Sequence, residues 1–455
     1  MTTLDNVKSV YFIGIGGIGM SALARYFKQQ GFPVAGYDKT PSPLTKKMED
    51  EEGFIITYED DEQKIEDCYK MPDSTLVVYT PAIPKDNHIL NFFKDNGFVL
   101  HKRAEVLGLV SRHKKALCVA GTHGKTTTTT LLAFLLKNSH VGCSAFLGGI
   151  SSNFGSNLLI DSHSEFVVIE ADEFDRSFLH LTPEMAVITA MDADHLDIYG
   201  TKENMLEAFE AFARLTRGKL FLKKGLVLKT REVDGVYAVE EKADYYTENL
   251  RVVDGSFVFD YISKDICIKD LRLRFPGRVN VENATAAITL ALYAGVTADE
   301  IRSALPEFKG VARRFDIHAN SGKIMYIDDY AHHPQEIRAV LSSIREMWPD
   351  KKITVSFQPH LYTRTRDFYP EFARSLSLAD EVILLDIYPA REQPIPGVTA
   401  DLIADRLTVP VSRVTKADFP GFVQEHVQEG IFITMGAGDI DRFIPTFTEM
   451  FNRKL

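Results

Sequence analysis

The chain has 455 residues, of which 45% are hydrophobic and 25% are charged, and its formal net charge is −11. These proportions are typical of globular proteins and exclude collagen-like, disulfide-rich and fully disordered chains. The acidic balance also argues against general nucleic-acid binding, which requires a basic surface. At about 150 residues per domain, the length predicts about three domains.

Targeting signals and cysteine motifs are missing from the sequence. The four cysteines form no C-x-x-C pair, so neither a zinc site nor a disulfide framework is expected. The N-terminal segment lacks the basic and apolar regions of a secretory signal. No apolar run approaches the roughly 20 residues that a membrane-spanning helix needs. We therefore expect a cytoplasmic protein that does not insert into a membrane.

Residues 1–112 are predicted to form the first domain. An apolar strand at 7–16 ends in glycines, a helix follows at 20–31, and a second strand covers 33–38. A further strand is expected at 75–83. This alternation of strand and helix is typical of a parallel sheet covered by helices, so we predict a Rossmann-like domain.

The first glycine loop lies between that first strand and its helix. Gly14, Gly16 and Gly19 form a complete G-x-G-x-x-G pattern, and Asp38 ends the next strand. The pattern is the dinucleotide fingerprint, but physically it requires only that a diphosphate approaches a helix N-terminus closely. NAD, FAD or a UDP-sugar would each satisfy it. Glycines that merely allow tight packing are the alternative.

Residues 113–316 are predicted to form a central domain with a parallel sheet of the P-loop ATPase type. A strand at 116–121 leads into a second glycine loop and an apolar helix at 131–138. Strands at 165–172 and 184–191 follow. Further on we predict a helix at 203–215, short strands over 218–275 and a capped helix at 276–295.

The second loop has the sequence G-T-H-G-K-T from Gly121 to Thr126. Successive backbone N–H groups in such a loop surround phosphate oxygens, helped by the helix N-terminus. Lys125 would neutralise β- and γ-phosphate charge, and the Thr126 hydroxyl would ligate Mg²⁺. The general pattern has an earlier glycine where Val119 stands, so this is a shorter variant. An ordinary glycine-rich turn with a surface lysine is the alternative.

Residues 317–455 are predicted to form a third domain, again Rossmann-like. A strand starting at residue 323 leads into a helix at 334–347. Strands follow at 352–358, 381–386 and from residue 430. The chain as a whole is therefore predicted to be an α/β protein of three domains.

Acidic and histidine side chains follow two strands of the central domain. Glu170, Asp172, Glu173 and Asp175 cluster at the end of the strand at 165–172. Ligands gather at the carboxyl ends of parallel strands, and a carboxylate there would hold Mg²⁺ beside a nucleotide. The alternative is that these acids cap turns. Asp192, Asp194 and His195 follow the next strand, where a hydrogen-bonded histidine is favoured over a metal ligand by the residues alone.

Further polar candidates lie later in the chain. For each of them the alternative to a binding or catalytic role is a structural one, as a helix cap, a solvated hinge or a structural polar group. Asparagines at a helix start would read a base edge, arginines at the domain junction would reach phosphates, and an arginine near Tyr362 would clamp a carboxylate through two hydrogen bonds. They are Asn280, Asn283, Arg313, Arg314, Asp328, Asp329, His332, His333, His360, Arg364 and Arg366.

Taken together, the motifs of the chain resemble those of the cytoplasmic Mur ligases. They occur in one order over essentially the whole chain, and the last two select the branch that adds L-alanine to UDP-N-acetylmuramate. They are GIGGIGMS, GTHGKTTT, EADEFD, DADHLDIYG, PGRVNVENATAA, GVARRFD, DDYAHHP and FQPHLYTRTRD. The resemblance implies a UDP-sugar domain, a central ATPase and a C-terminal amino-acid domain.

The resemblance also implies roles for individual residues. The UDP-sugar would be held by Gly14, Gly16, Gly17, Ile18, Gly19, Asp38 and Arg103. ATP would be held by Gly121, Thr122, His123, Gly124, Lys125, Thr126, Thr127, Asn283, Arg314 and Asp329. Two Mg²⁺ ions would lie at Thr126, Glu170 and His195. For His195 the resemblance therefore favours a metal ligand over a hydrogen-bonded histidine. Catalysis would involve Lys125, His195, His332, His360 and Arg364.

The sequence departs from the family pattern at Leu361, where arginine is usual after the Q-P-H histidine. Glu210 stands where several relatives carry a carbamylated lysine, which favours the L-alanine branch. The second hypothesis is a ligase of cell-wall recycling that joins a whole tripeptide to the same sugar. A dehydrogenase would leave Lys125 unexplained, and a non-catalytic nucleotide-binding regulator would leave Lys125, Glu170 and His195 unexplained. The sequence leaves open whether His332 or His360 deprotonates the amine.

Overall fold

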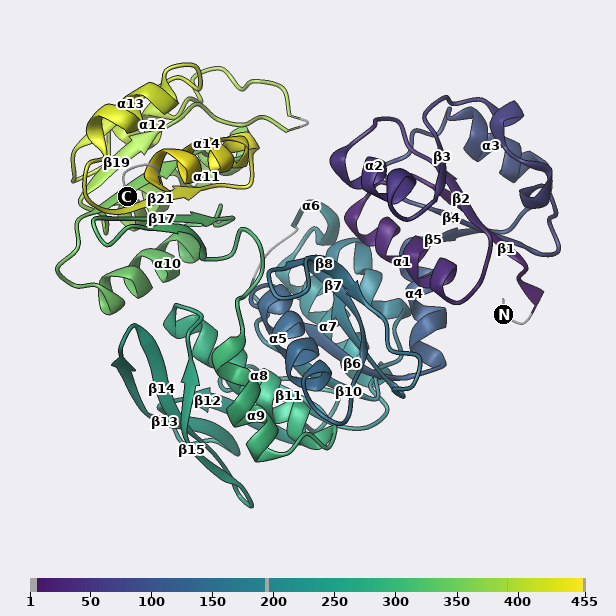
Figure 1. Cartoon of the computed structure of the whole chain (residues 1–455), viewed down its shortest axis with the longest axis horizontal. Coiled ribbons are helices and arrows are strands. Elements are labelled where there is room, and N and C mark those ends of the chain that lie inside the picture. Colours follow the sequence, from purple (N-terminus) through teal and green to yellow (C-terminus); the bar gives the residue numbers. More distant parts are fainter. Residues whose placement is uncertain (1–5, 193–195, 391, 453–455) are drawn as a thin grey trace. The chain divides into compact units, whose positions relative to one another are not determined.

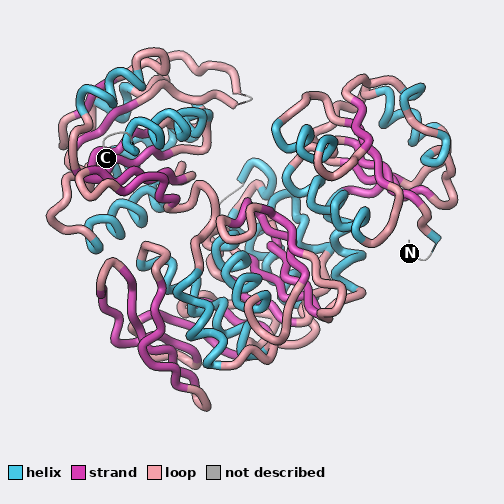
Figure 2. The backbone as a smooth tube through the Cα atoms, viewed as in Figure 1, coloured by secondary structure: helices cyan, strands magenta, loops and turns pink. Residues whose placement is uncertain are grey.

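The computed structural model describes residues 6–192, 196–390 and 392–452. Strands and helices alternate along the chain, and the strands assemble into three sheets (Figure 1). Figure 2 shows cyan helices beside the magenta strands of each sheet. The predicted three-domain α/β architecture is confirmed. Within the described ranges, no helix combines the length and the apolar character needed to cross a bilayer.

By its internal contacts the chain divides into two compact units. The first unit comprises Met1–Glu248, Asp260–Lys269 and Asn283–Leu305. The second unit comprises Asn249–Phe259, Asp270–Glu282 and Pro306–Leu455. The first two sheets share the first unit for most of their length, and the third sheet lies in the second unit. The boundaries 1–112, 113–316 and 317–455 therefore stay a prediction.

The first sheet is parallel throughout and has five strands. In spatial order these are β3 (Ile55–Thr57), β2 (Val34–Tyr37), β1 (Ser9–Ile13), β4 (Thr75–Tyr79) and β5 (Leu100–Lys102). Alternate residues of β1 face opposite sides of the sheet. Val10 and Phe12 join one apolar core while Tyr11 and Ile13 join another, so helices cover both faces.

The central sheet has ten strands, and its middle is parallel. Spatially it runs β15 (Cys267–Leu273), β14 (Ser256–Ser263), β13 (Tyr245–Val253), β12 (Gly235–Val239), β11 (Leu220–Lys223), β10 (Met185–Ile188), β6 (Lys115–Ala120), β9 (Phe166–Ala171), β7 (Ser144–Ser151) and β8 (Ser156–Leu159). The last pair, β7 with β8, is antiparallel, which the sequence analysis did not predict.

The third sheet has six strands. Spatially these are β16 (Asp316–Asn320), β17 (Ile324–Asp329), β21 (Gly430–Met435), β18 (Ile353–Phe357), β19 (Glu381–Leu384) and β20 (Val411–Arg413). β16 was not predicted and pairs antiparallel with β17, while the remaining pairs are parallel. The carboxyl ends of β17, β21 and β18 therefore meet at one edge.

Side-chain caps mark the starts of some helices but not of all. For α7, the Thr201 hydroxyl accepts a hydrogen bond from the Asn204 amide, and the buried Phe209 and Phe212 pack against Phe178. The helices are α1 (Ile18–Gln29), α2 (Pro43–Asp50), α3 (His88–Asp95), α4 (Arg103–Arg112), α5 (Lys125–Lys137), α6 (Leu196–Tyr199), α7 (Lys202–Leu215), α8 (Arg278–Tyr293), α9 (Ala298–Ala304), α10 (Pro334–Met347), α11 (Tyr362–Leu376), α12 (Asp401–Ala404), α13 (Phe419–His426) and α14 (Ile444–Asn452).

Candidate functional site

The phosphate loop, residues 121–126, connects β6 to α5 as the sequence predicts. Gly121 and Gly124 adopt φ of 133° and 81°, a region that strongly favours glycine. A Cβ on Gly121 would also come within 2.3 Å of the Thr189 hydroxyl on the neighbouring strand. The loop thus depends on its glycines both for its turn and for its close packing.

Lys125 is the first residue of α5 and is nearly buried. Its ammonium donates to the Gly121 carbonyl and to the Glu173 carboxylate, each at 2.8 Å. The Lys125 side chain is 12% exposed and that of Glu173 is 0% exposed. Burial opposes the charge, but the carboxylates of Glu173, Asp172 and Glu170 outweigh it and raise the pKa of Lys125. The lysine is therefore a fixed cation at the start of the helix.

Thr126 and Glu170 meet one residue further along the helix. The Thr126 hydroxyl donates to Glu170 Oε1 at 3.0 Å, and the Gly148 amide donates to Glu170 Oε2 at 3.0 Å. A Cβ on Gly148 would come within 2.1 Å of the same carboxylate. Two oxygen ligands of the kind that Mg²⁺ prefers are thus held together beside the phosphate loop.

His195 lies outside the described residues, as does Asp194. In the described part of the chain, no group of three or more histidine, cysteine and acidic side chains is arranged to hold a metal. Just before the gap, Asp192 Oδ2 lies 3.7 Å from His123 Nε2, and the Asp192 amide donates to the Thr122 hydroxyl at 3.1 Å. The segment that leads to His195 is therefore tied to the phosphate loop.

Asn283 of α8 packs beneath the phosphate loop. Its side-chain oxygen accepts a hydrogen bond from Thr128 at 3.2 Å and would lie 2.7 Å from a Cβ on Gly124. Asn283 is 5% exposed, and Thr127 beside it is 8% exposed. Asn283 therefore contacts the N-terminal part of α5 through Thr128. Its contact with an adenine base stays a prediction.

The first glycine loop connects β1 to α1. Gly14 has φ of 89° and its amide donates to the Tyr37 carbonyl at 2.7 Å, while the Gly16 amide donates to Asp38 Oδ2 at 2.7 Å. Gly17 is the residue before α1, which starts at Ile18. The loop and Asp38 are therefore assembled into one turn at the N-terminus of a helix.

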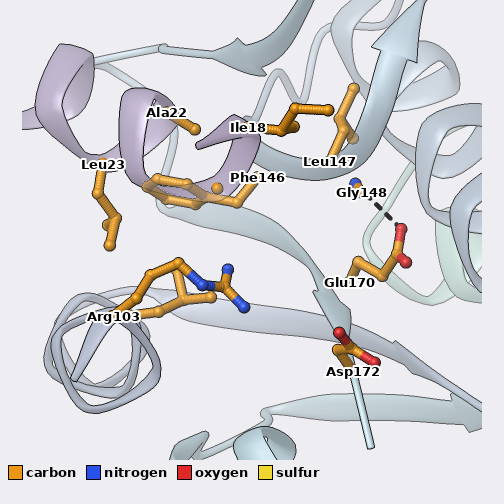
Figure 3. A pocket seen from close by; sticks show the side chains of 11 residues that line it. Ile18, Ala22, Leu23, Arg103, Phe146, Leu147, Gly148, Glu170 and Asp172 are labelled. Atoms are coloured by element: carbon orange, nitrogen blue, oxygen red, sulfur yellow. Dashed lines mark hydrogen bonds between the residues drawn. The ribbon is translucent and has the colours of Figure 1, made fainter. Parts of the chain in front are cut away.

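A pocket of about 280 Å³ lies between this helix and the acidic end of β9 (Figure 3). Its apolar wall comes from α1 and β7, and Arg103, the first residue of α4, lies across from Glu170 and Asp172. Over the residues that the structure describes, the Arg103 side chain makes no hydrogen bond or ion pair. A Cβ on Gly19 would come within 2.7 Å of its guanidinium, so the glycine leaves room for this arginine.

The turn that carries Glu173 was not recognised from the sequence as part of the site. Asp175 and Arg176 both have positive φ, 51° and 55°, which is unusual for residues other than glycine. Asp175 pairs with Lys102 at 3.1 Å, and the Tyr199 hydroxyl donates to the Glu173 carbonyl at 2.6 Å. The four acids at the end of β9 and after it carried no signal that Glu173 would pair with Lys125.

In the second unit, Arg313 and Arg314 have different surroundings. Arg313 donates to Asp328 Oδ2 at 3.1 Å and to Asp441 Oδ2 at 3.0 Å, so two carboxylates hold its guanidinium, and its predicted contact with a phosphate stays a prediction. Both guanidinium groups lie over the Tyr330 ring, that of Arg313 at 5.1 Å and that of Arg314 at 5.2 Å, but only Arg313 also pairs with Asp328 and Asp441 among the contacts that the described residues make. Asp329 accepts the amides of Phe315 and Ala331, each at 2.7 Å. Burial raises the pKa of Asp329 to about 6, although Arg314 opposes this shift.

Three predicted residues of the second unit do come together, and we call them the acceptor cluster: His332, His360 and Arg364. The two imidazole rings lie 6.0 Å apart, and Arg364 Nη1 lies 3.4 Å from His360 Nδ1. His332 follows β17 and His360 follows β18, so the common edge of the parallel strands joins them. Burial, with the charges of His332 and Arg364, lowers the pKa of His360 to about 4.

Leu361 lies between His360 and α11 in a strained conformation with φ of 71° and ψ of 138°. Three hydrogen bonds hold its backbone: its amide donates to the Tyr388 carbonyl at 2.9 Å, and its carbonyl accepts the amide and hydroxyl of Thr365. The His360 ring stacks on Tyr388 at 5.8 Å. The departure from the family pattern therefore lies in a turn that orients His360.

Glu210 on α7 does not face the phosphate loop. It accepts the amides of Lys229 at 2.5 Å and Thr230 at 3.1 Å, and also the Thr230 hydroxyl. These hydrogen bonds outweigh desolvation and lower the pKa of Glu210. At this position the carboxylate of Glu210 holds the loop at Lys229 and Thr230 against α7.

Comparison with known proteins matches three family models to consecutive parts of the chain. Residues 9–115 match the Mur ligase family, catalytic domain; residues 119–291 match the Mur ligase middle domain; and residues 313–438 match the Mur ligase, glutamate ligase domain.

Whole-chain relatives agree with these matches. The UDP-N-acetylmuramate–L-alanine ligase of Phocaeicola vulgatus is 51% identical over 99% of this chain and 100% of its own. The crystal structure of a UDP-N-acetylmuramate–alanine ligase from Thermotoga maritima superimposes with a TM-score of 0.82 at 31% identity, covering 98% of this chain and all of its own. A murein peptide ligase from Psychrobacter arcticus shares the fold, with a TM-score of 0.66 at 21% identity, covering 98% of this chain and 99% of its own.

Removing one partner of the Lys125–Glu173 pair should destabilise the protein strongly. Lys125→Met leaves a fully buried carboxylate without its cation, which costs about 3 kcal/mol of unfolding free energy. In Lys125→Met/Glu173→Gln no charge is left unpaired, so much of that loss is recovered. The exposed pair Lys115–Glu165 is the control, since Lys115→Met should cost less than about 1 kcal/mol. Urea unfolding of the four proteins tests this, and equal losses for both lysine variants would contradict it.

The low pKa of His360 predicts a loss of stability in acid. The unfolded imidazole has a pKa near 6.5, above its folded value of about 4, so the unfolded state gains a proton first. The stability that the neutral His360 contributes is fully present above about pH 6.5 and is lost as the pH falls from about 6.5 through about 4. His332, Arg364, Glu392 and Tyr388 surround the ring. The unfolding free energy, measured with urea at several pH values across this range, should fall less steeply with decreasing pH for His360→Asn than for the unmodified protein. An equally steep fall would contradict the low pKa of His360.

Proposed function

The chain belongs to the Mur ligase family, and we propose that it is the ATP-dependent ligase that joins L-alanine to the lactyl carboxylate of UDP-N-acetylmuramate. This reaction is a peptide-forming step of cell-wall precursor synthesis. The observation that carries the proposal is the convergence of Lys125, Thr126 and Glu170 at the ends of β6 and β9, in a chain 51% identical to a protein of that name. We also propose a cytoplasmic location.

The phosphate loop is proposed to hold ATP. Lys125 is a cation at a helix N-terminus, where the amides also favour anions, so both effects suit a triphosphate. The phosphates would replace Glu173 as partners of the ammonium. Gly121 to Thr127 would surround the phosphate chain, and Asn283, Arg314 and Asp329 would contact the rest of the nucleotide.

We propose that Thr126 and Glu170 hold a Mg²⁺ ion. Their oxygens are already 3.0 Å apart, and the hydroxyl–carboxylate pair fits the donor preference of the ion. Bound there, Mg²⁺ would neutralise charge on the phosphates and on the incoming carboxylate. His195 is proposed for a second ion.

The pocket of Arg103 is proposed to receive the sugar end of UDP-N-acetylmuramate. Its single cation has no ion-pair partner among the described residues and lies across from Glu170, near which the lactyl carboxylate must react. The glycine loop from Gly14 to Gly19, with Asp38, is proposed for the uridine diphosphate.

The chemistry follows from the poor reactivity of a carboxylate toward an amine. The lactyl carboxylate attacks the γ-phosphorus of ATP, the bond to ADP breaks, and an acyl phosphate forms. The L-alanine nitrogen then attacks the acyl carbon and phosphate leaves. Lys125 lowers the repulsion between the two anions of the first step, and the acceptor cluster is proposed to bind L-alanine for the second.

We propose the division 1–112 for the UDP-sugar, 113–316 for ATP and 317–455 for the amino acid. The three sheets and the three matched segments, 9–115, 119–291 and 313–438, support it.

Activity assays should show phosphate release that requires both ATP and UDP-N-acetylmuramate and that prefers L-alanine over glycine and L-serine. Lys125→Ala should abolish the release, because the loop loses its cation, while the exposed Lys115→Ala should retain it. A preference for L-Ala-γ-D-Glu-meso-diaminopimelate would instead identify a recycling ligase. No release with any acceptor would refute the proposal.

Arg103→Ala should raise the KM for UDP-N-acetylmuramate by about tenfold or more, since a charge-assisted hydrogen bond contributes about 1.5–3 kcal/mol. The KM for ATP should change little. Arg112→Ala, at the exposed end of the same helix, is the control. Steady-state kinetics on the three proteins tests the pocket, and an unchanged KM in Arg103→Ala would exclude Arg103 from it.

A further inference from the structure

The two histidines of the acceptor cluster are held in opposite tautomers. His332 Nδ1 lies 3.0 Å from the Tyr330 carbonyl oxygen, and Glu336 Oε2 lies 3.4 Å from the same nitrogen. Both oxygens accept hydrogen bonds, so Nδ1 must carry the proton. The neutral ring then has its free lone pair at Nε2.

His360 has the reverse arrangement. Its Nδ1 lies 3.4 Å from Arg364 Nη1. An arginine side chain has donors only and does not deprotonate in proteins, so His360 Nδ1 must accept. The proton of the neutral His360 ring is therefore on Nε2, and this nitrogen can only donate.

The surroundings of both rings favour the neutral form of the imidazole. Burial lowers the pKa of His332, and the positive charges of Arg364 and Arg314 act in the same direction, although Glu336 opposes them. Burial, His332 and Arg364 likewise lower the pKa of His360.

We propose that His332 Nε2 is the base that deprotonates the ammonium of the acceptor amino acid, and that His360 and Arg364 act as donors beside it. The proposal rests on the ligase function above and chooses between two histidines that the sequence leaves equivalent. Arg364 and His360 Nε2–H are suited to the carboxylate of the same amino acid, since both present hydrogens.

The ammonium gives one proton to His332 Nε2, and the nitrogen lone pair forms the C–N bond to the acyl carbon. As the tetrahedral intermediate collapses, the C–O bond breaks and its electron pair leaves with phosphate. The departing phosphate oxygen takes the second proton from nitrogen. The products are the amide, hydrogen phosphate and a protonated His332, which then returns its proton to solvent.

The test compares His332→Asn with His360→Asn. An asparagine amide can still donate to the Tyr330 carbonyl at position 332, and its oxygen can still accept from Arg364 at position 360. Each variant thus keeps the local hydrogen bond and loses only the outer ring nitrogen. Thermal unfolding first establishes that both variants fold.

Two readouts separate the steps. Exchange of labelled ADP into ATP that depends on UDP-N-acetylmuramate reports acyl phosphate formation. Product formation is measured with L-alanine, an ammonium at neutral pH, and with hydroxylamine, which is largely neutral there and needs no base. His332→Asn should keep the exchange, lose about 100-fold or more in kcat with L-alanine, and keep its rate with hydroxylamine. His360→Asn should show equal changes with the two nucleophiles.

Equal losses for both nucleophiles in His332→Asn, or a selective loss with L-alanine in His360→Asn, would overturn the proposal. If the protein lacks the proposed ligase activity itself, the result differs from both of these, because the unmodified protein would then show no exchange that depends on UDP-N-acetylmuramate. Exchange in the unmodified protein, together with a nucleophile-selective defect at position 332 alone, is the supporting result.

Discussion

The pairing register of β6 and β9 determines where the Glu170 carboxylate lies in the first unit. These strands are parallel neighbours in which Val119 pairs with Glu170 and Ala120 with Ala171. Because β6 ends at Ala120, the Glu170 side chain emerges beside the loop that follows, within 3.0 Å of the Thr126 hydroxyl. Side chains alternate between the faces of a strand, so a shift of one residue would turn the carboxylate to the other face of the sheet. The parallel pairing that builds the core thus also places a proposed metal ligand.

Electrostatics explains why a carboxylate belongs next to the phosphate loop. A lysine that is 12% exposed loses most of its hydration, and an unpaired cation there would be costly. Glu173 removes that cost while no nucleotide is bound. A triphosphate brings more negative charge and its own hydrogen-bond acceptors, so it can replace the carboxylate as partner. The pair therefore keeps Lys125 charged and oriented while the proposed nucleotide site holds no nucleotide.

Local sequence patterns predicted the parts of the site that depend on local geometry. The glycines at 121 and 124 and the helix after them follow from one short segment, as does the loop before α1. Contacts between distant segments were not predictable in the same way. The pairing of Glu173 with Lys125 depends on a turn with two positive φ angles at Asp175 and Arg176, which no glycine marked. The antiparallel strand β16 has only five residues, and the alternation of Ile317 and Ala319 with polar residues is too short to identify a strand.

Strained backbone marks the places where distant contacts decide the structure. Asp175, Arg313 and Leu361 all have positive φ: Arg313 precedes Arg314, Leu361 follows His360, and Asp175 lies two residues after Glu173, the partner of Lys125. In each case the strain is opposed by specific contacts: Asp175 pairs with Lys102, Arg313 with Asp328 and Asp441, and Leu361 with Tyr388 and Thr365. Such conformations persist only where the surrounding structure over-determines them. At Leu361 this means that the backbone, and not the side chain that replaces the usual arginine, sets the orientation of His360. The tautomer of His360 is then determined by Arg364 one helical turn later, so the acceptor cluster keeps its hydrogen-bond polarity despite the substitution.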